Sequence, residues 1–191
     1  MYFQSRGVCI TDTNEEIIEQ RLKVIIVGDP GAGKQNVAKG ADVCVPFKTF
    51  GVSIGKKTNL DKKINYKLTL IFWTLTENRP KKTTYFHGAG AAIIVGNLDN
   101  WYSIRKMRNW VGTIRNNIGD IPIFFIGTKQ NSHPTKNLVK LKQLANQYNS
   151  RYFVLSQSQE GGLKTIFKSI AKHIGNNYYK LIKTEPITPN S

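Results

Sequence analysis

The chain has 191 residues, the length of one ordinary domain, with 40% hydrophobic and 21% charged residues, a composition that excludes a disordered protein. Its 28 basic and 12 acidic residues give a net charge of +16, which favours an acidic partner. No apolar run approaches the roughly 18 residues of a membrane-spanning helix, no secretory signal is recognised, and the 2 cysteines make no disulfide framework, so a cytoplasmic protein is expected.

Residues 1–20 are expected to form an N-terminal extension, whose opening, Met1–Ser5, is similar to the remnant of a protease-cleavage tag. Apolar runs then predict six strands. In chain order they are Arg21–Val27, Thr49–Lys57, Ile64–Thr74, Ala91–Gly96, Ile121–Gly127 and Arg151–Leu155. The polar turn Thr58–Lys63 between the second and third strands predicts an antiparallel hairpin.

Helices are expected between the strands. A short helix should begin at Lys34, and three longer helices carry apolar residues at spacings of three and four, within Ile104–Ile118, Leu138–Tyr148 and Leu163–Ile174. Strands that alternate with helices predict an α/β domain over residues 21–176, with a six-stranded, mostly parallel sheet and helices on both faces. Residues 177–191 are expected to form a C-terminal tail.

A phosphate-binding loop is indicated between the first strand and the first helix. The segment Gly28-Asp29-Pro30-Gly31-Ala32-Gly33-Lys34 fits the pattern G-x-x-x-x-G-K. Glycines let successive backbone N–H groups point at phosphate oxygens, and the lysine reaches the terminal phosphates. Gln35 follows where such loops carry Ser or Thr to ligate Mg²⁺, so a phosphate cradle is predicted without its usual metal ligand. The alternative is a glycine-rich turn that binds nothing.

Further motifs follow in order along the chain. They are Thr49-Phe50-Gly51-Val52, Tyr85-Phe86-His87-Gly88-Ala89 with Ile93–Val95 after it, Gly127-Thr128-Lys129-Gln130-Asn131, and Leu155-Ser156-Gln157-Ser158. With the phosphate loop they resemble the Ras superfamily of small GTPases, closest to its Rab branch, from about Leu22 to Asn176. The resemblance implies a P-loop G domain that binds GTP or GDP and meets protein partners through its switch-like regions. It implies that nucleotide contacts come from Gly28–Gln35, Thr128, Lys129, Asn131, Ser156, Gln157 and Ser158.

The chain departs from the family where the family needs a metal and a positioned water. The segment Phe72–Pro80 lacks the D-x-x-G-Q motif, whose Asp holds Mg²⁺, whose Gly contacts the third phosphate and whose Gln orients the water. Asn131 replaces the Asp that accepts two hydrogen bonds from guanine, which weakens guanine binding. The sequence therefore favours a degenerate small GTPase, or pseudo-GTPase, that acts as a binding or assembly module. It would hold GTP or GDP weakly, with little role for Mg²⁺ and no assigned catalytic residue.

Two other functions stay open. One is an active, atypical Rab-like GTPase in vesicle trafficking or signalling. The other is a basic G-domain subunit of a nucleic-acid or ribonucleoprotein assembly, which rests on charge alone. The basic surface fits an acidic protein, a nucleic acid, an anionic membrane or plain solvation, and no prenylation or myristoylation motif for a lipid anchor is recognised. Trp73, at the end of a strand, is a candidate anchor for a protein partner.

Overall fold

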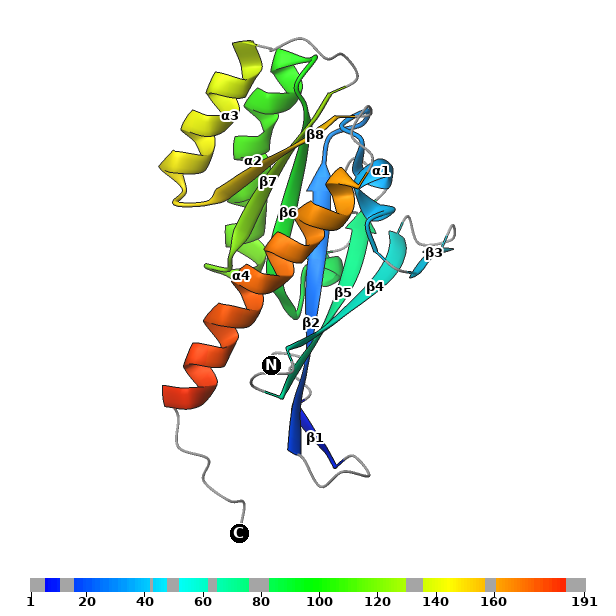
Figure 1. Ribbon diagram of the computed structural model, residues 1–191. Helices are drawn as coiled ribbons and strands as arrows, with labels where there is room; N and C mark the ends of the chain where they lie inside the picture. The colour runs from blue at the N-terminus through cyan, green and yellow to red at the C-terminus, as the bar shows by residue number, and fades with distance from the viewer. Residues whose placement is uncertain are drawn as a thin grey trace.

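The computed structural model describes residues 6–10, 16–41, 43–47, 52–61, 65–75, 83–129, 136–156 and 161–184. Within them one eight-stranded sheet carries helices on both faces (Figure 1), so the predicted α/β P-loop architecture is confirmed. The strands are β1 (Arg6–Ile10), β2 (Glu16–Gly28), β3 (Val43–Phe47), β4 (Val52–Asp61), β5 (Tyr66–Leu75), β6 (Ala89–Asn97), β7 (Ile123–Lys129) and β8 (Arg151–Ser156). The helices are α1 (Lys34–Ala38), α2 (Trp101–Ile118), α3 (Lys136–Gln147) and α4 (Gly162–Thr184), and Thr83–Tyr85 form a 3-10 turn.

The order of the strands brings the expected site to one edge of the sheet. The sheet runs β3-β4-β5-β2-β6-β7-β8, with β1 paired to β2 beside this path. The neighbours from β5 to β8 are parallel, whereas β1, β3 and β4 pair antiparallel. Carboxyl ends of parallel strands share one edge, where open α/β sheets bind their ligands. Here Gly28 lies opposite Val95, and Lys129 lies opposite Ser156.

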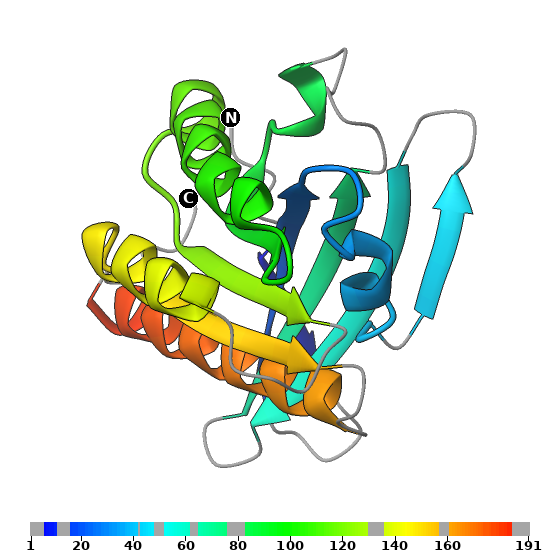
Figure 2. The same cartoon turned by 90° about the horizontal axis from the view of Figure 1, so that it is seen from above.

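Each face of the sheet has its own hydrophobic core, because alternate residues of a strand point to opposite faces. On β2, Val24 and Ile26 join the core that α1 and α4 cover, whereas Ile25 and Val27 join the core beneath α2 and α3. Figure 2 shows α4 on one side of the sheet and α2 and α3 on the other. Full burial of one such side chain contributes about 1.5–3 kcal/mol, so β2 is firmly held where it enters the phosphate loop.

The helices follow the predicted apolar spacing. Helix α2 buries Ile104, Met107 and Val111 against the sheet. Its first turn is capped by Asn100, whose Oδ1 accepts a hydrogen bond of 3.0 Å from the backbone N–H of Tyr102. Across the described ranges, no helix has both the length and the hydropathy that would be needed to cross a membrane.

The structure adds two strands to the six that were predicted. Strand β1 and the start of β2 lie within residues 1–20, so β2 crosses the expected end of the extension. This part of β2 escaped prediction because charged and polar residues flank its two isoleucines, Ile17 and Ile18, yet it pairs with β5 and buries a 2.6 Å hydrogen bond from the Tyr66 hydroxyl to Gln20 Oε1. Strand β3 pairs antiparallel with β4 and so adds a third strand to the predicted hairpin of β4 and β5. Helix α4 ends at Thr184, beyond the expected limit at residue 176.

Candidate phosphate-binding site

The backbone of the phosphate loop needs glycine at both of its ends. Gly28 closes β2, and a Cβ at this position would collide with the backbone oxygen of Val95 on β6. Gly33 has a left-handed φ of 86° just before α1, and a Cβ there would meet the Thr128 side chain at 3.0 Å. The two glycines let the chain turn from strand to helix while it stays in contact with β6 and β7.

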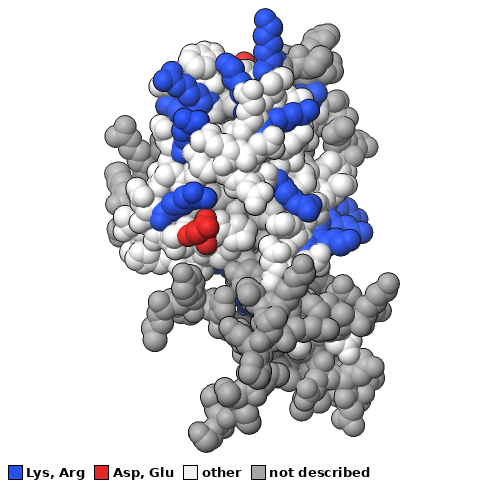
Figure 3. All heavy atoms as spheres, turned by 90° about the vertical axis from the view of Figure 1, so that its left-hand side faces the viewer, with Lys and Arg blue, Asp and Glu red and all other residues white. Residues whose placement is uncertain are grey.

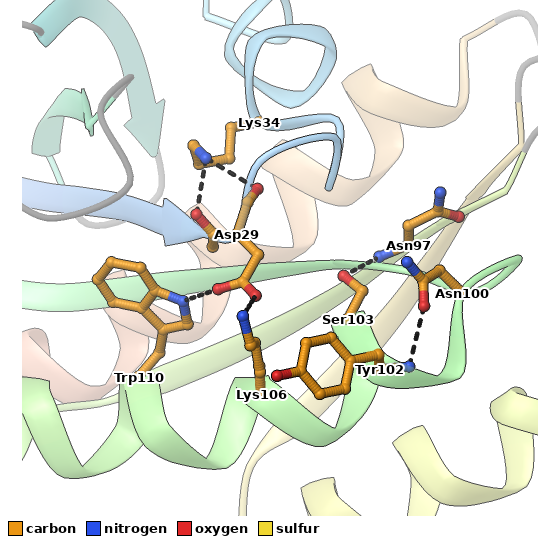
Figure 4. Close-up of polar contacts among 9 residues, drawn as sticks. Asp29, Lys34, Asn97, Asn100, Tyr102, Ser103, Lys106 and Trp110 are labelled. Carbon is orange, nitrogen blue, oxygen red and sulfur yellow. Dashed lines mark hydrogen bonds and ion pairs between the residues drawn. The ribbon is translucent and has the colours of Figure 1, made fainter.

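Lys34 lies folded over the loop, with an exposed fraction of 7%. Its Nζ donates hydrogen bonds to the backbone oxygens of Gly28, at 2.6 Å, and Asp29, at 3.0 Å (Figure 4). Burial lowers the pKa of Lys34, and the nearby Asp29 opposes this change. An ammonium group has three N–H donors, so the two carbonyls orient the group and leave a third donor for a phosphate oxygen.

Asp29 fastens the loop to α2. Its carboxylate accepts a hydrogen bond from Trp110 Nε1 at 3.0 Å and forms an ion pair with Lys106 Nζ at 3.1 Å (Figure 4). The hydrogen bond that Lys106 donates to Asp29 raises the pKa of Lys106, desolvation opposes this change, and the negative charge of Asp29 adds to the rise. Sequence reasoning assigned Asp29 to the loop but missed this role. The available signal was the spacing of Lys106 and Trp110, which share one face of α2 at i and i+4.

Thr128, predicted to contact the nucleotide, also braces the phosphate loop from β7. Its Oγ1 donates a hydrogen bond of 2.8 Å to the backbone oxygen of Ala32. The backbone oxygen of Thr128 accepts a hydrogen bond of 2.7 Å from the backbone N–H of Leu98, just before α2. Lys129 and Ser156 end β7 and β8 beside each other, and Ser156 is buried. The phosphate loop and the carboxyl ends of β7 and β8 therefore lie at one edge of the sheet.

Other predicted site residues are either exposed or outside the described ranges. Pro30, Gly31 and Gln35 are exposed on the outer side of the loop and the first turn of α1. The structure does not describe Thr49, Asn131, Gln157 or Ser158, nor residues 76–82 of the expected second switch.

The described residues do not fit a Mg²⁺ site. They contain no group of three His, Cys, Asp or Glu side chains suited to a metal ion. The carboxylate of the phosphate loop, Asp29, is already engaged by Lys106 and Trp110. Thr74 near the end of β5 is buried and offers a hydroxyl, and Gln35 offers an exposed amide. Mg²⁺ prefers carboxylate, phosphate and water oxygens in a tight octahedron, which this donor set does not supply.

Comparison with known proteins supports the sequence prediction. Residues 23–176 match the model of the Ras family. Ras-related protein Rab-11B of Dictyostelium discoideum is 27% identical over 87% of this chain and 78% of its own length. Ras-related protein RAB1BV of Beta vulgaris is 26% identical, over 80% of this chain and 75% of its own. Ras-related protein Rab-34 of Homo sapiens is also 26% identical, over 78% and 62%.

The family model covers most of the chain, and these relatives all carry Rab names. Ras-family proteins in general bind GTP or GDP with Mg²⁺, and they contact protein effectors through their switch regions. The fold, the phosphate loop and the order of the motifs agree with this match. The chain is therefore a member of the Ras family of small GTPases, near the Rab branch.

Proposed function

We propose that the chain is a degenerate Ras-family protein that holds a nucleotide by its phosphates and serves as a binding or assembly module with little or no hydrolysis. The observation that carries this proposal is the contrast at the loop. Support for phosphate binding comes from the Lys34 ammonium, which two loop carbonyls orient, and from the positive φ angles of the loop glycines. In the sequence, Gln35 stands where such loops carry the Ser or Thr that ligates Mg²⁺, and the D-x-x-G-Q motif is missing after β5.

Phosphate recognition would come from the loop itself. The Lys34 ammonium supplies a charge-assisted contact, and the backbone N–H groups at the start of α1 add further donors. A hydrogen bond to a charged partner contributes about 1.5–3 kcal/mol, so loss of Lys34 should weaken affinity roughly 10- to 150-fold. Gly28–Gln35 are the proposed phosphate contacts. Thr128, Lys129, Asn131, Ser156, Gln157 and Ser158 are the proposed surroundings of the base.

Hydrolysis should be negligible because the groups that serve it in the family are missing. The chain has no D-x-x-G-Q motif after β5, so no glutamine is available there to orient the attacking water. Intact family members turn over at only about 10⁻⁴ per second without help. A chain without these groups is expected to stay at the background rate.

The first test determines whether the purified protein contains a bound nucleotide. Heat denaturation should release GTP or GDP, identified by chromatography. Titrations with GTP would then compare wild type with Lys34→Ala and with Lys39→Ala, which removes the same charge from an exposed position at the end of α1. Lys34→Ala should bind GTP roughly 10- to 150-fold more weakly, and Lys39→Ala should keep the wild-type affinity. Equal binding by all three proteins would show that the loop is only a structural turn.

A protein partner is proposed at the face that carries Trp73. Trp73 on β5 lies opposite Ile54 on β4, and both side chains are half-buried. Lys23 Nζ lies 4.1 Å from the centre of the Trp73 ring and donates a hydrogen bond of 2.9 Å to the backbone oxygen of His87. A partly exposed indole beside a cation is a common anchor in protein interfaces. Proteins that wild type retains, that Trp73→Ala loses and that Trp101→Ala keeps would identify this partner.

The competing function is an active Rab-like GTPase in trafficking or signalling. The relatives carry the names of Ras-related Rab proteins, which favours the Rab-like part of this alternative. Single-turnover hydrolysis with and without Mg²⁺ separates the two functions. A Mg²⁺-dependent rate at or above about 10⁻⁴ per second would favour the active enzyme.

A further inference from the structure

A second surface carries features of a binding site. The large apolar side chains that are most exposed in the described part of the chain are Trp101, Tyr102 and Val139, with exposed fractions of 50%, 50% and 58%. They stand at the beginnings of α2 and α3. Asn137 Nδ2 on α3 donates a hydrogen bond of 2.8 Å to the backbone oxygen of Leu98, just before α2, and so ties the two helix starts together. The fold therefore presents large apolar groups to solvent at one place.

Cations from both helices surround these aromatic rings. The Arg105 guanidinium lies 5.7 Å from the centre of the Trp101 ring, and Lys140 Nζ lies 5.4 Å from it. Lys106 Nζ lies 4.5 Å from the centre of the Tyr102 ring. Helices α2 and α3 together carry basic residues and no acidic ones. The face that carries α3 shows many Lys and Arg side chains and few acidic ones (Figure 3).

We propose that Trp101, Tyr102, Arg105, Val139 and Lys140, here called the Trp101 patch, bind an acidic segment of a partner protein that carries an apolar residue beside its carboxylates. The charge of the patch is complementary to such a segment, and Trp, Tyr and Arg are the residues that dominate protein interfaces. Arg105 and Lys140 come from different helices and lie near the same ring, so one or two carboxylates can pair with both cations. The apolar residue of the segment packs on Trp101 and Val139.

The arrangement favours a peptide over single-stranded nucleic acid. A base binds such a surface by stacking on an open aromatic face. The Trp101 ring already has two cations within 6 Å, so stacking a base on it has to compete with existing cation–π contacts. Carboxylates instead strengthen the arrangement, because they pair with cations that the rings already hold in place. The proposal does not rest on the proposed nucleotide binding, since the patch contains no residue of the phosphate loop.

The test uses the full chain and a displayed library of random twelve-residue peptides. Peptides selected on wild type should be enriched in Asp and Glu beside an apolar residue. One of these peptides, made synthetically with a fluorescent label, should bind the double variant Arg105→Glu/Lys140→Glu at least tenfold more weakly. Trp101→Ala should weaken binding by a similar factor while it leaves the charge unchanged. Lys106 is not varied, because its contact with Asp29 would disturb the phosphate loop.

The matched control is Lys164→Glu/Lys172→Glu, which makes the same change of charge at exposed positions of α4. It should alter peptide affinity less than twofold. Equal losses in the two double variants would show that net charge alone attracts the peptide, and a library without acidic enrichment would also overturn the proposal. A labelled oligouridine or phosphatidylserine vesicle that binds wild type and is lost with Trp101→Ala, while the acidic peptide is unaffected, would assign the patch to nucleic acid or membrane instead. GTP titrations of the same variants should be unchanged, which separates this test from that of the phosphate loop.

Discussion

The contact between Trp110 and Asp29 measures how firmly α2 holds the phosphate loop. Trp110→Phe keeps an aromatic ring in the core but removes the N–H that donates to Asp29 Oδ1 at 3.0 Å. Little water competes at this contact, because Trp110 is 9% exposed and the Asp29 side chain is 18% exposed. A hydrogen bond to a charged acceptor contributes about 1.5–3 kcal/mol. Lys106 stays paired with Asp29 and compensates in part, so we expect the low end, about 1.5 kcal/mol of coupling.

A double-mutant cycle isolates this coupling from the loss of indole volume. The free energy of unfolding in urea would be measured for wild type, Trp110→Phe, Asp29→Ala and the double variant. Both single variants should destabilise the protein, and the double variant should be about 1.5 kcal/mol more stable than the sum of the two losses predicts. A coupling below about 0.3 kcal/mol would refute the reasoning, because the loop would then be held without this bond.

Three further predictions concern the backbone, the pH dependence and the base. Gly28→Ala should destabilise the fold by about 1–3 kcal/mol more than Gly31→Ala in urea unfolding, because its Cβ meets the Val95 oxygen, whereas a Cβ at Gly31 meets no described atom within 4 Å; equal losses would mean that β2 and β6 separate easily. Burial lowers the pKa of Lys23 from 10.5 to about 8. Between these two pH values the unfolded chain therefore holds a proton that the folded protein has released, and the free energy of unfolding should rise with pH. The difference between wild type and Lys23→Met, measured from pH 7 to pH 11, should show this rise, and a flat difference would contradict it. Asn131→Asp should raise the preference for GTP over ATP by about tenfold or more in paired titrations, and a wild type that already prefers GTP by more than this would show an intact base pocket.

The parts of the fold that could be predicted have local signals. The buried strands appear in the sequence as apolar runs. The phosphate loop is recognisable because one strand-to-helix turn requires Gly28, Gly33 and Lys34 at fixed spacing. The beginning of β2 has no such signal. Glu16, Glu19 and Gln20 flank its two isoleucines, and Gln20 becomes a suitable buried residue only after Tyr66 on the neighbouring strand supplies a hydroxyl.

The site shows the same division between local and distant signals. Lys34 was predicted to face the phosphates, and its two carbonyl contacts lie within six residues of it. The role of Asp29 depends on Trp110, which is 81 positions away and reaches it only after α2 packs on the sheet. The sequence likewise placed Thr128 near the nucleotide through a motif, but its bond to Ala32 exists because β7 ends beside the loop. Such partners depend on tertiary packing, which one sequence does not reveal.

Lys106 takes part in two contacts at once, and this has a thermodynamic consequence. Its ammonium pairs with the Asp29 carboxylate of the phosphate loop and also lies against the exposed ring of Tyr102. A molecule that displaces the Tyr102 ring therefore also shifts the Lys106 ammonium relative to the Asp29 carboxylate. An anion bound in the phosphate loop likewise attracts the Lys106 ammonium. Linkage makes the coupling reciprocal: whatever factor a ligand on the outer face of α2 applies to phosphate affinity, phosphate applies the same factor to the affinity of that ligand.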